Sequence, residues 1–146
     1  ITSWELSQNK IKNTLITDNA SGLVYSKKKV DFTIVGADRV GMFGHVFNKI
    51  GTFNKAVLSK TFKVPFLVAL PTSTIDRSLK KNTDIVKIEE RSPKEILTKM
   101  FWGNEHSKKY PNIFNPGFDI TNPKFVDYYV TEKGNFKKIE KLKNVF

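Results

Sequence analysis

The chain has 146 residues, of which 39% are hydrophobic and 12% aromatic, a composition that predicts a folded domain with its own core and excludes a disordered segment. It has no cysteine and only His45 and His106, which excludes disulfides, thiolate metal sites, a cysteine nucleophile and a histidine-rich metal site within this chain. No apolar run approaches the roughly 20 residues that cross a bilayer, and the first ten residues lack the basic and apolar regions of a signal peptide.

The net charge of +11, from 25 basic and 14 acidic residues, has two interpretations. A basic surface attracts nucleic acid or phosphate, whereas a lysine-rich chain also carries positive charge on an ordinary solvated surface. Lysine far outnumbers arginine, although surfaces that read bases favour arginine, and the lysines are spread along the whole chain. The pattern favours a solvated surface, so no nucleic-acid partner is expected.

The first forty residues predict a helix and two strands. Residues 2–13 (TSWELSQNKIKN) are typical of the last turns of a helix, and they begin abruptly, as in the back part of a longer protein. The apolar run 14–19 ends in turn residues and predicts a strand, and residues 19–29 fit a helix or a loop. Segment 30–38 (VDFTIVGAD) is β-branched and nearly all apolar, which predicts a parallel strand buried on both faces.

The middle of the chain predicts a loop, a helix and a strand. Residues 36–52 are rich in glycine and are expected to form a flexible loop. Residues 52–63 carry apolar side chains near helical spacing, so an amphipathic helix is predicted there. The segment VPFLVALP at 64–71 predicts a second buried strand that Pro71 closes.

The last third predicts shorter elements. A short strand is expected within 85–93, and a capping box at Ser92 to Glu95 is expected to begin a helix over 95–101. Residues 107–123 are dense in Pro, Asn and Gly and predict a loop. Two further elements complete the order, a helix at 123–129 and a strand at 128–134.

Strands that alternate with helices predict an α/β fold, with a doubly wound, mostly parallel sheet of Rossmann-like topology flanked by helices. No repeat or linker interrupts the pattern, so residues 1–146 are predicted to form a single domain. Ligands bind such folds outside the carboxyl ends of the strands. Three segments are therefore expected to meet in one crevice: residues 18–19, 36–52 and 71–76.

Asp38 ends the apolar run 30–38 and is the first candidate for chemistry. An acid at the rim of a buried strand loses hydration, which favours the protonated carboxyl and lets such a group exchange protons near neutral pH. We therefore expect Asp38 to be shielded from water. Two structural roles compete with this interpretation, since Asp38 is equally suited to pair with Arg39 or to cap the next helix.

Asn48 and Lys49 come just before the helix that is predicted to start near Thr52. Backbone N–H groups at a helix start, together with an amide and a lysine, suit an anionic oxygen such as that of a phosphate. The glycines of this loop match neither a Walker loop nor a dinucleotide fingerprint. A solvated lysine on a turn is the competing interpretation.

Seven segments occur in the order found in the 5-methylthioribose-1-phosphate isomerase family: LITDNA, VDFTIVGADRV, GHVFNKIGT, VPFLVALPTSTID, IEERSP, FNPGFDIT and VTEKG. From TSWEL to TEKG the chain resembles the carboxyl-terminal, Rossmann-like domain of that family. The related regulatory subunits of translation initiation factor 2B share NKIGT and a PF strand, but they usually lack the ADR, PTSTID and EERSP segments. The isomerase branch is therefore the nearer resemblance.

The resemblance implies a cytoplasmic isomerase of methionine salvage that converts an aldose phosphate, methylthioribose 1-phosphate, into a ketose phosphate. It implies that no metal or organic cofactor takes part, that no membrane is involved, and that the protein forms a homodimer. The aspartate of GADR, here Asp38, is then the catalytic acid. The Asn-Lys pair before IGT, here Asn48 and Lys49, is then in contact with the sugar-phosphate substrate.

Two departures from the family pattern stand out. The family usually has NGD where this chain has Phe43, Gly44 and His45, which we expect to lie beside the acid. The family's catalytic cysteine and phosphate-binding arginines precede TSWEL, so its amino-terminal domain is absent from this chain. We therefore expect residues 1–146 to be inactive alone and to need an amino-terminal domain or fragment. The alternative is a non-catalytic regulatory or binding module related to the factor 2B subunits.

Overall fold

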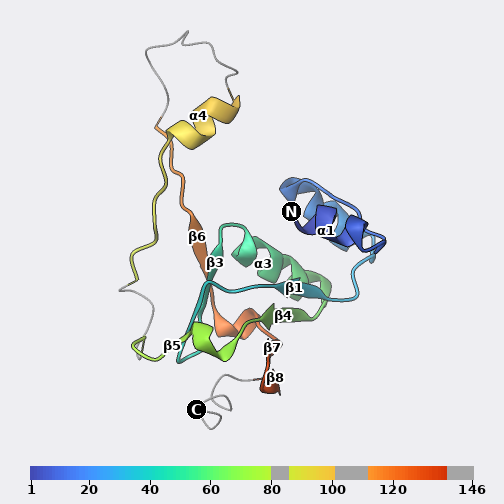
Figure 1. The fold of residues 1–146 in the computed structure, drawn as a ribbon, viewed down its shortest axis with the longest axis vertical. Coiled ribbons are helices and arrows are strands. Elements are labelled where there is room, and N and C mark those ends of the chain that lie inside the picture. The colour runs from blue at the N-terminus through green and yellow to red at the C-terminus, as the bar shows by residue number, and fades with distance from the viewer. Residues whose placement is uncertain (80–85, 101–111, 138–146) are drawn as a thin grey trace.

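The computed structural model describes residues 1–79, 86–100 and 112–137, and Figure 1 shows how they are arranged. The α-helices are α1 (Thr2–Gln8), α2 (Ser21–Ser26), α3 (Thr52–Phe62) and α4 (Lys94–Met100). The strands are β1 (Thr33–Val35), β2 (Arg39–Gly41), β3 (Val46–Lys49), β4 (Phe66–Ala69), β5 (Ile75–Asp76), β6 (Phe118–Thr121), β7 (Tyr128–Thr131) and β8 (Gly134–Phe136). Short 3₁₀ turns lie at Asp18–Ala20, Thr72–Thr74 and Pro123–Phe125.

The first sheet has the strand order β1-β4-β7-β8. Its first three strands are parallel, with Thr33 paired to Phe66 and Leu67 paired to Tyr128. Strand β8 returns antiparallel to β7 through a tight turn that ends at Gly134, the first residue of β8, whose φ is +123°. A glycine suits this turn because a positive φ brings the Cβ of other residues too close to the backbone.

The second sheet has the order β5-β2-β3-β6 and is built around a hairpin of β2 and β3. The two strands run antiparallel, with Arg39 opposite Phe47. The hairpin turns at Gly44, whose φ is +86° and whose N–H donates to the carbonyl of Gly41 at 2.8 Å. Strand β6, more than 60 residues further along the chain, pairs antiparallel with β3 and places Thr121 opposite Val46.

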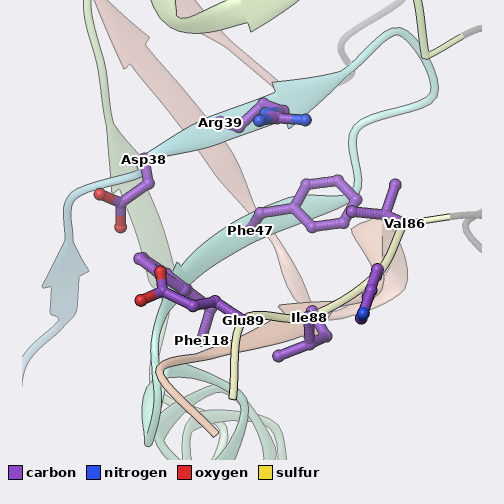
Figure 2. A pocket seen from close by; sticks show the side chains of 8 residues that line it. Asp38, Arg39, Phe47, Val86, Ile88, Glu89 and Phe118 are labelled. Carbon is purple, nitrogen blue, oxygen red and sulfur yellow. The ribbon is translucent and has the colours of Figure 1, made fainter. Parts of the chain in front are cut away.

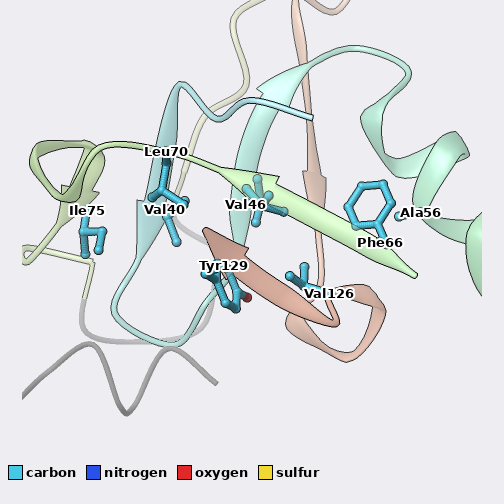
Figure 3. Close-up of a cluster of buried hydrophobic side chains, with 9 residues drawn as sticks. Val40, Val46, Ala56, Phe66, Leu70, Ile75, Val126 and Tyr129 are labelled. Carbon is cyan, nitrogen blue, oxygen red and sulfur yellow. The ribbon is translucent and has the colours of Figure 1, made fainter. Parts of the chain in front are cut away.

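Side chains from both sheets and from α3 meet in one hydrophobic core, and Figure 3 shows them pointing toward one another. The cluster consists of Val40, Val46, Ala56, Phe66, Val68, Leu70, Ile75, Val126 and Tyr129. The hydroxyl of Tyr129, in the first sheet, donates to the carbonyl of Gly44 at the hairpin turn at 2.6 Å. The core and this bond join the two sheets.

Strand β6 carries a buried polar side chain, that of Thr121. Thr121 is fully buried, and its Oγ1 has no hydrogen-bond partner among the residues that the structure describes.

Helix α3 packs through a stripe of small side chains, Thr52, Ala56 and Ser59, which all lie on one face and are buried. The Oγ of Ser59 donates to Thr33 Oγ1 at 2.9 Å and lies 3.2 Å from the hydroxyl of Tyr25. These hydroxyls are polar and largely buried, and they satisfy one another. The contact fixes α3 against both α2 and β1.

The structure confirms the α/β class, the helix at α3 and the strand at β4. The sheets are mixed rather than mostly parallel, because three of the six strand pairings in the described ranges are antiparallel. The expected flexible loop at 36–52 is wrong, since most of it forms the β2-β3 hairpin. The expected loop at 107–123 is also wrong in part, because residues 118–121 form β6, while residues 107–111 lie outside the described ranges.

Three predictions of strands, at residues 14–19, 30–38 and 85–93, are wrong in whole or in part. Residues 14–19 form no strand. The N–H of Ala20 bonds the carbonyl of Thr17 in a 3₁₀ turn, and Leu15 is 83% exposed. Strand β1 is an edge strand and not buried on both faces, since Ile34 is 54% exposed. Residues 86–93 contain only an isolated bridge, between Glu90 and Pro116.

Candidate functional site

Asp38 lies directly before β2 and lines a pocket of about 200 Å³ in the second sheet (Figure 2). Its backbone N–H donates to the carbonyl of Phe47 at 3.0 Å, so the start of the hairpin fixes its position. The pocket is lined by Asp38, Arg39, Phe47, Val86, Lys87, Ile88, Glu89 and Phe118. Two acids and two cations thus share one hollow with aromatic and aliphatic side chains.

The expectation that Asp38 is shielded from water is wrong for this chain, because the residue is exposed. It lies at the rim of the pocket, one residue outside the paired part of the hairpin, whereas Val40 two residues later is fully buried. The side chain of Asp38 thus lines an open pocket.

The two structural roles that competed for Asp38 belong to other carboxylates. The guanidinium of Arg39 pairs with Asp76, at 3.6 Å. The start of α3 is capped by Asp119, whose carboxylate accepts from the N–H of Gly51 at 2.7 Å and from that of Phe53 at 3.1 Å. Asp38 therefore neither pairs with Arg39 nor caps α3, and its carboxyl group is left to the pocket.

Asn48 is half-buried on β3, and its side chain joins the turn that leads into α3. Its Nδ2 donates to Thr52 Oγ1 at 2.9 Å, and Thr52 Oγ1 donates to the carbonyl of Lys49 at 2.8 Å. The backbone N–H of Asp38 donates to the carbonyl of Phe47, the residue before Asn48, so both predicted site residues lie near the base of the hairpin.

Lys49 is exposed at the end of β3. Its ammonium nitrogen lies 5.7 Å from the centroid of the Phe118 ring, a cation–π distance. Phe118 also lines the pocket of Asp38, so the same ring borders both residues. Lys49 itself opens on an adjoining hollow of about 290 Å³, which Arg91 and Asn115 also line.

The start of α3 is not an open anion site, contrary to the sequence-based expectation. Asp119 occupies the N–H groups that a phosphate would use, although it lies 68 residues away in the chain. Burial raises the pKa of this carboxyl, and the bonds from Phe53 and Gly51 act in the opposite direction. An incoming anion would therefore have to displace a carboxylate of the protein.

The sequence analysis missed Glu89 and Lys87, which the structure places in the Asp38 pocket. Figure 2 shows the carboxyl groups of Asp38 and Glu89 on the same side of it. The segment is held by backbone bonds to the chain before β6, since the N–H of Gly117 donates to the carbonyl of Glu89 at 2.8 Å. The motif IEERSP was visible in the sequence, but nothing local to it indicates which residues it faces.

Phe43 and His45 do not lie beside Asp38, as the sequence comparison led us to expect. They flank Gly44 at the tip of the hairpin, five or more residues from Asp38, or roughly 16 Å along an extended chain of ~3.3 Å per residue. Neither is among the described residues that line the Asp38 pocket. His45 is half-buried, and burial lowers the pKa of its imidazole.

Of the three segments expected to share one crevice, residues 36–52 and 71–76 lie together and residues 18–19 do not. Strand β5, which follows Pro71, pairs with β2, and the Arg39–Asp76 contact joins the same two segments. Asp18 lies elsewhere, because its carboxylate contacts the ammonium group of Lys55 on α3 at 3.1 Å. The hydroxyl and N–H of Thr72 bond the carboxylate of Glu132, so they serve the turn and not a ligand.

Within residues 1–79, 86–100 and 112–137, no helix is long and apolar enough to cross a membrane. No cluster of three acidic or histidine side chains in the same ranges is arranged to hold a metal ion.

Comparisons with known proteins find two kinds of relative, isomerases and translation initiation factor subunits. Residues 1–138 match the Initiation factor 2 subunit family. The chain is 45% identical over 137 residues to a methylthioribose-1-phosphate isomerase of Aquifex aeolicus, covering 94% of this chain and 29% of that protein. It is 46% identical over 134 residues to the isomerase of Desulforamulus reducens, covering 92% of this chain and 38% of that protein.

Solved structures agree with these matches. The 5-methylthioribose 1-phosphate isomerase of Pyrococcus horikoshii superimposes with a TM-score of 0.88 at 38% identity, over all of this chain and 40% of that one. The delta subunit of translation initiation factor eIF-2B from A. fulgidus superimposes with a TM-score of 0.85 at 37% identity, over 99% and 42%. The resemblance that the sequence motifs indicated is confirmed, and the chain belongs to the Initiation factor 2 subunit family.

Proposed function

We propose that this chain supplies the acid-bearing part of a sugar-phosphate isomerase that converts methylthioribose 1-phosphate into methylthioribulose 1-phosphate. The observation that carries the proposal is the placement of Asp38. Its carboxyl group lines a pocket, while Asp76 and Asp119 take the structural roles that would otherwise occupy it. Identity of 45–46% to isomerases of that name supports this substrate.

The proposed reaction moves hydrogen between adjacent carbons after the sugar ring opens. Asp38 acts as the acid that protonates a sugar oxygen, a task for which a carboxyl group at a hollow is suited. Lys49 offers its positive charge to the substrate phosphate, and Asn48 offers amide hydrogen bonds, from strand β3, whose Phe47 accepts the backbone N–H of Asp38. Proton transfer between carboxyl and sugar needs no metal or organic cofactor.

The open pocket limits what these residues do alone. A catalytic site must exclude water and hold its substrate within a fraction of an ångström, and Asp38 is exposed here. The chain spans 29–40% of the length of the isomerases to which we compare it. On this proposal the rest of the site comes from a part of the protein that corresponds to the remaining length of those relatives.

The experiment measures isomerisation of the aldose phosphate by the full-length protein and its Asp38→Asn variant. We expect kcat/KM to fall by about 10²–10⁴-fold, the usual contribution of a general acid. Asp31→Asn is the matched control, because Asp31 is also exposed but does not line the pocket. An Asp38→Asn variant as fast as Asp31→Asn would reject the assignment of Asp38.

A second candidate is a non-catalytic regulatory module, which the match to the eIF-2B delta subunit of A. fulgidus supports. The position of Phe43 and His45 away from the pocket weakens the argument that they impair the chemistry. Binding of the sugar phosphate without turnover by the full-length protein would favour the module.

We further propose that the protein is a cytoplasmic homodimer that acts in methionine salvage. Sedimentation of the purified protein tests whether it is a dimer.

A further inference from the structure

The link between β3 and α3 carries the proposed substrate-binding pair and is very short. Strand β3 ends at Lys49 and α3 begins at Thr52, so only Ile50 and Gly51 lie between them. Gly51 has a φ of +101°, a conformation that glycine adopts readily and other residues rarely do. The directions of the Asn48 and Lys49 side chains therefore depend on how this turn is held.

Asp119 holds this turn from the neighbouring strand. The ladder of β3 and β6 pairs Asn48 directly with Asp119. From that position one carboxylate oxygen accepts from the N–H of Gly51 at 2.7 Å, and both oxygens lie 3.1 Å from the nitrogen of Phe53. A charged acceptor makes such bonds shorter and stronger than neutral ones, and negative charge is favourable at the start of a helix.

Two further contacts make the turn a closed unit. The N–H of Ile50 donates to the carbonyl of Gly117 at 3.1 Å, two residues before Asp119 on the same segment. On the other side, Asn48 bonds the hydroxyl of Thr52, which returns a bond to the backbone of β3. Asp119 is itself half-buried, so its position is fixed by packing as well as by the ladder.

We infer that Asp119 is a positioning residue for the proposed substrate site. Its carboxylate fixes the turn at Ile50 and Gly51 in the shape that presents Asn48 and Lys49 to a ligand. The residue touches no substrate on this account. It acts through the two backbone N–H groups, and the consequence of losing it is weaker substrate binding. This inference rests on the proposed function for its link to substrate.

The test compares Asp119→Asn with Asp127→Asn in the full-length protein. Asp127 is a matched control, because its carboxylate also accepts a backbone N–H from another strand, that of Phe66 at 2.8 Å, but it lies outside the turn. We expect Asp119→Asn to raise KM by about ten-fold with a much smaller change in kcat, the pattern of lost ground-state binding. Asp127→Asn should leave both constants near those of the natural protein.

A second measurement is independent of turnover. Amide hydrogen exchange should quicken at Gly51 and Phe53 in Asp119→Asn, whereas in Asp127→Asn it should quicken at Phe66 and leave the turn unchanged. Unchanged exchange at Gly51 and Phe53, or an unchanged KM in an active Asp119→Asn enzyme, would overturn the inference.

The two measurements separate this inference from the proposed function. If the natural full-length protein shows no isomerase activity, the proposed function fails. The exchange data then decide whether Asp119 shapes the turn: selective loss of protection there supports the inference, and no loss overturns it.

Discussion

The two sheets of this molecule differ in what they do and in how the sequence encodes them. The first sheet is centred on the apolar strands β4 and β7, and it contributes the large buried side chains Phe66 and Tyr129. The second sheet carries Asn48 and Lys49, with Asp38 at its edge, and is assembled from segments far apart in the chain. Local sequence patterns reveal a core strand, whereas a site built by distant pairing is visible only in the structure.

One core nevertheless joins the two sheets, and the predictions below test whether they unfold together. Val40 and Val46 of the second sheet are fully buried in the same cluster as Phe66 and Val68 of the first. If the sheets are one cooperative unit, damage to either should weaken both equally.

The largest effect is expected from Phe66→Ala in β4. Phe66 is fully buried, so its truncation leaves a cavity and should lower the free energy of unfolding by about 3–5 kcal/mol. Phe114→Ala is the control, because Phe114 is 77% exposed and its loss should change stability by less than about 0.5 kcal/mol. Urea unfolding of the full-length protein measures both.

Native-state hydrogen exchange of the Phe66→Ala protein sharpens the comparison of the sheets. Protection should fall by the same amount at Val40 in β2 and at Val68 in β4 if the core is shared. A fall confined to the first sheet would show that the hairpin is stable on its own.

A smaller effect is expected from Tyr129→Phe, which removes the hydroxyl that bonds Gly44 at the hairpin turn. Burial raises the pKa of Tyr129 far above its usual value, so the hydroxyl stays protonated and donates to Gly44. Loss of this bond leaves a buried carbonyl unpaired and should cost about 1–3 kcal/mol in unfolding free energy.

Tyr128→Phe is the control for this bond, because Tyr128 is half-buried on the same strand and keeps its ring in the variant. Equal stability of the two variants, measured by thermal unfolding, would mean that the hydroxyl of Tyr129 does not join the sheets.

The smallest effect concerns pH and the contact between β5 and β2. Hydrogen bonds from Ser78, and to a lesser degree the charge of Arg39, lower the pKa of Asp76 below its usual value of 3.8. A carboxyl whose pKa is lowered by folding stabilises the protein above that usual value, and the contribution is lost as pH falls through the lowered pKa. Asp76→Asn should remove this contribution, which we expect to be under about 1 kcal/mol.

The measurement compares urea midpoints of the natural protein and Asp76→Asn at pH 6 and pH 3. The natural protein should lose more stability on acidification than the variant does. Asp119 works in the opposite direction, because burial raises its pKa and folding then becomes more favourable as it gains a proton. Both proteins contain Asp119, so its contribution cancels in the comparison, and an equal loss in both would contradict the assignment to Asp76.

The sequence predicted the parts of the fold that depend on short-range patterns. Strand β4 follows from the apolar run that Pro71 ends. Helix α3 forms where the spacing of apolar residues predicted it, but its buried face consists of Thr52, Ala56 and Ser59, while Phe53, Val57 and Phe62 are exposed. The hairpin of β2 and β3 was missed because Gly41 and Gly44 resemble a loop, although Gly44 serves to close the turn. Pairing with β6 then converts the rest of the segment into sheet.

The candidate site was predictable only in its most local members. Asp38, Asn48 and Lys49 were predicted from motifs, and the structure places Asp38 at a pocket and the other two on the neighbouring strand β3. Asp119 and Glu89 were not found, because their positions depend on segments that lie far away in the chain. The exposure of Asp38 was also beyond reach, since an apolar run shows that a strand exists but not which end of it meets water.

The unpartnered hydroxyl of Thr121 has a consequence for the durability of the protein. Among the described residues this atom gives up its hydration without gaining a bond in return. The ladder pairs Thr121 with Val46 of β3, so this hydroxyl lies in the interior of the second sheet. It marks a place where evolution or engineering has room to make the molecule more heat-resistant without touching the residues that would handle a sugar.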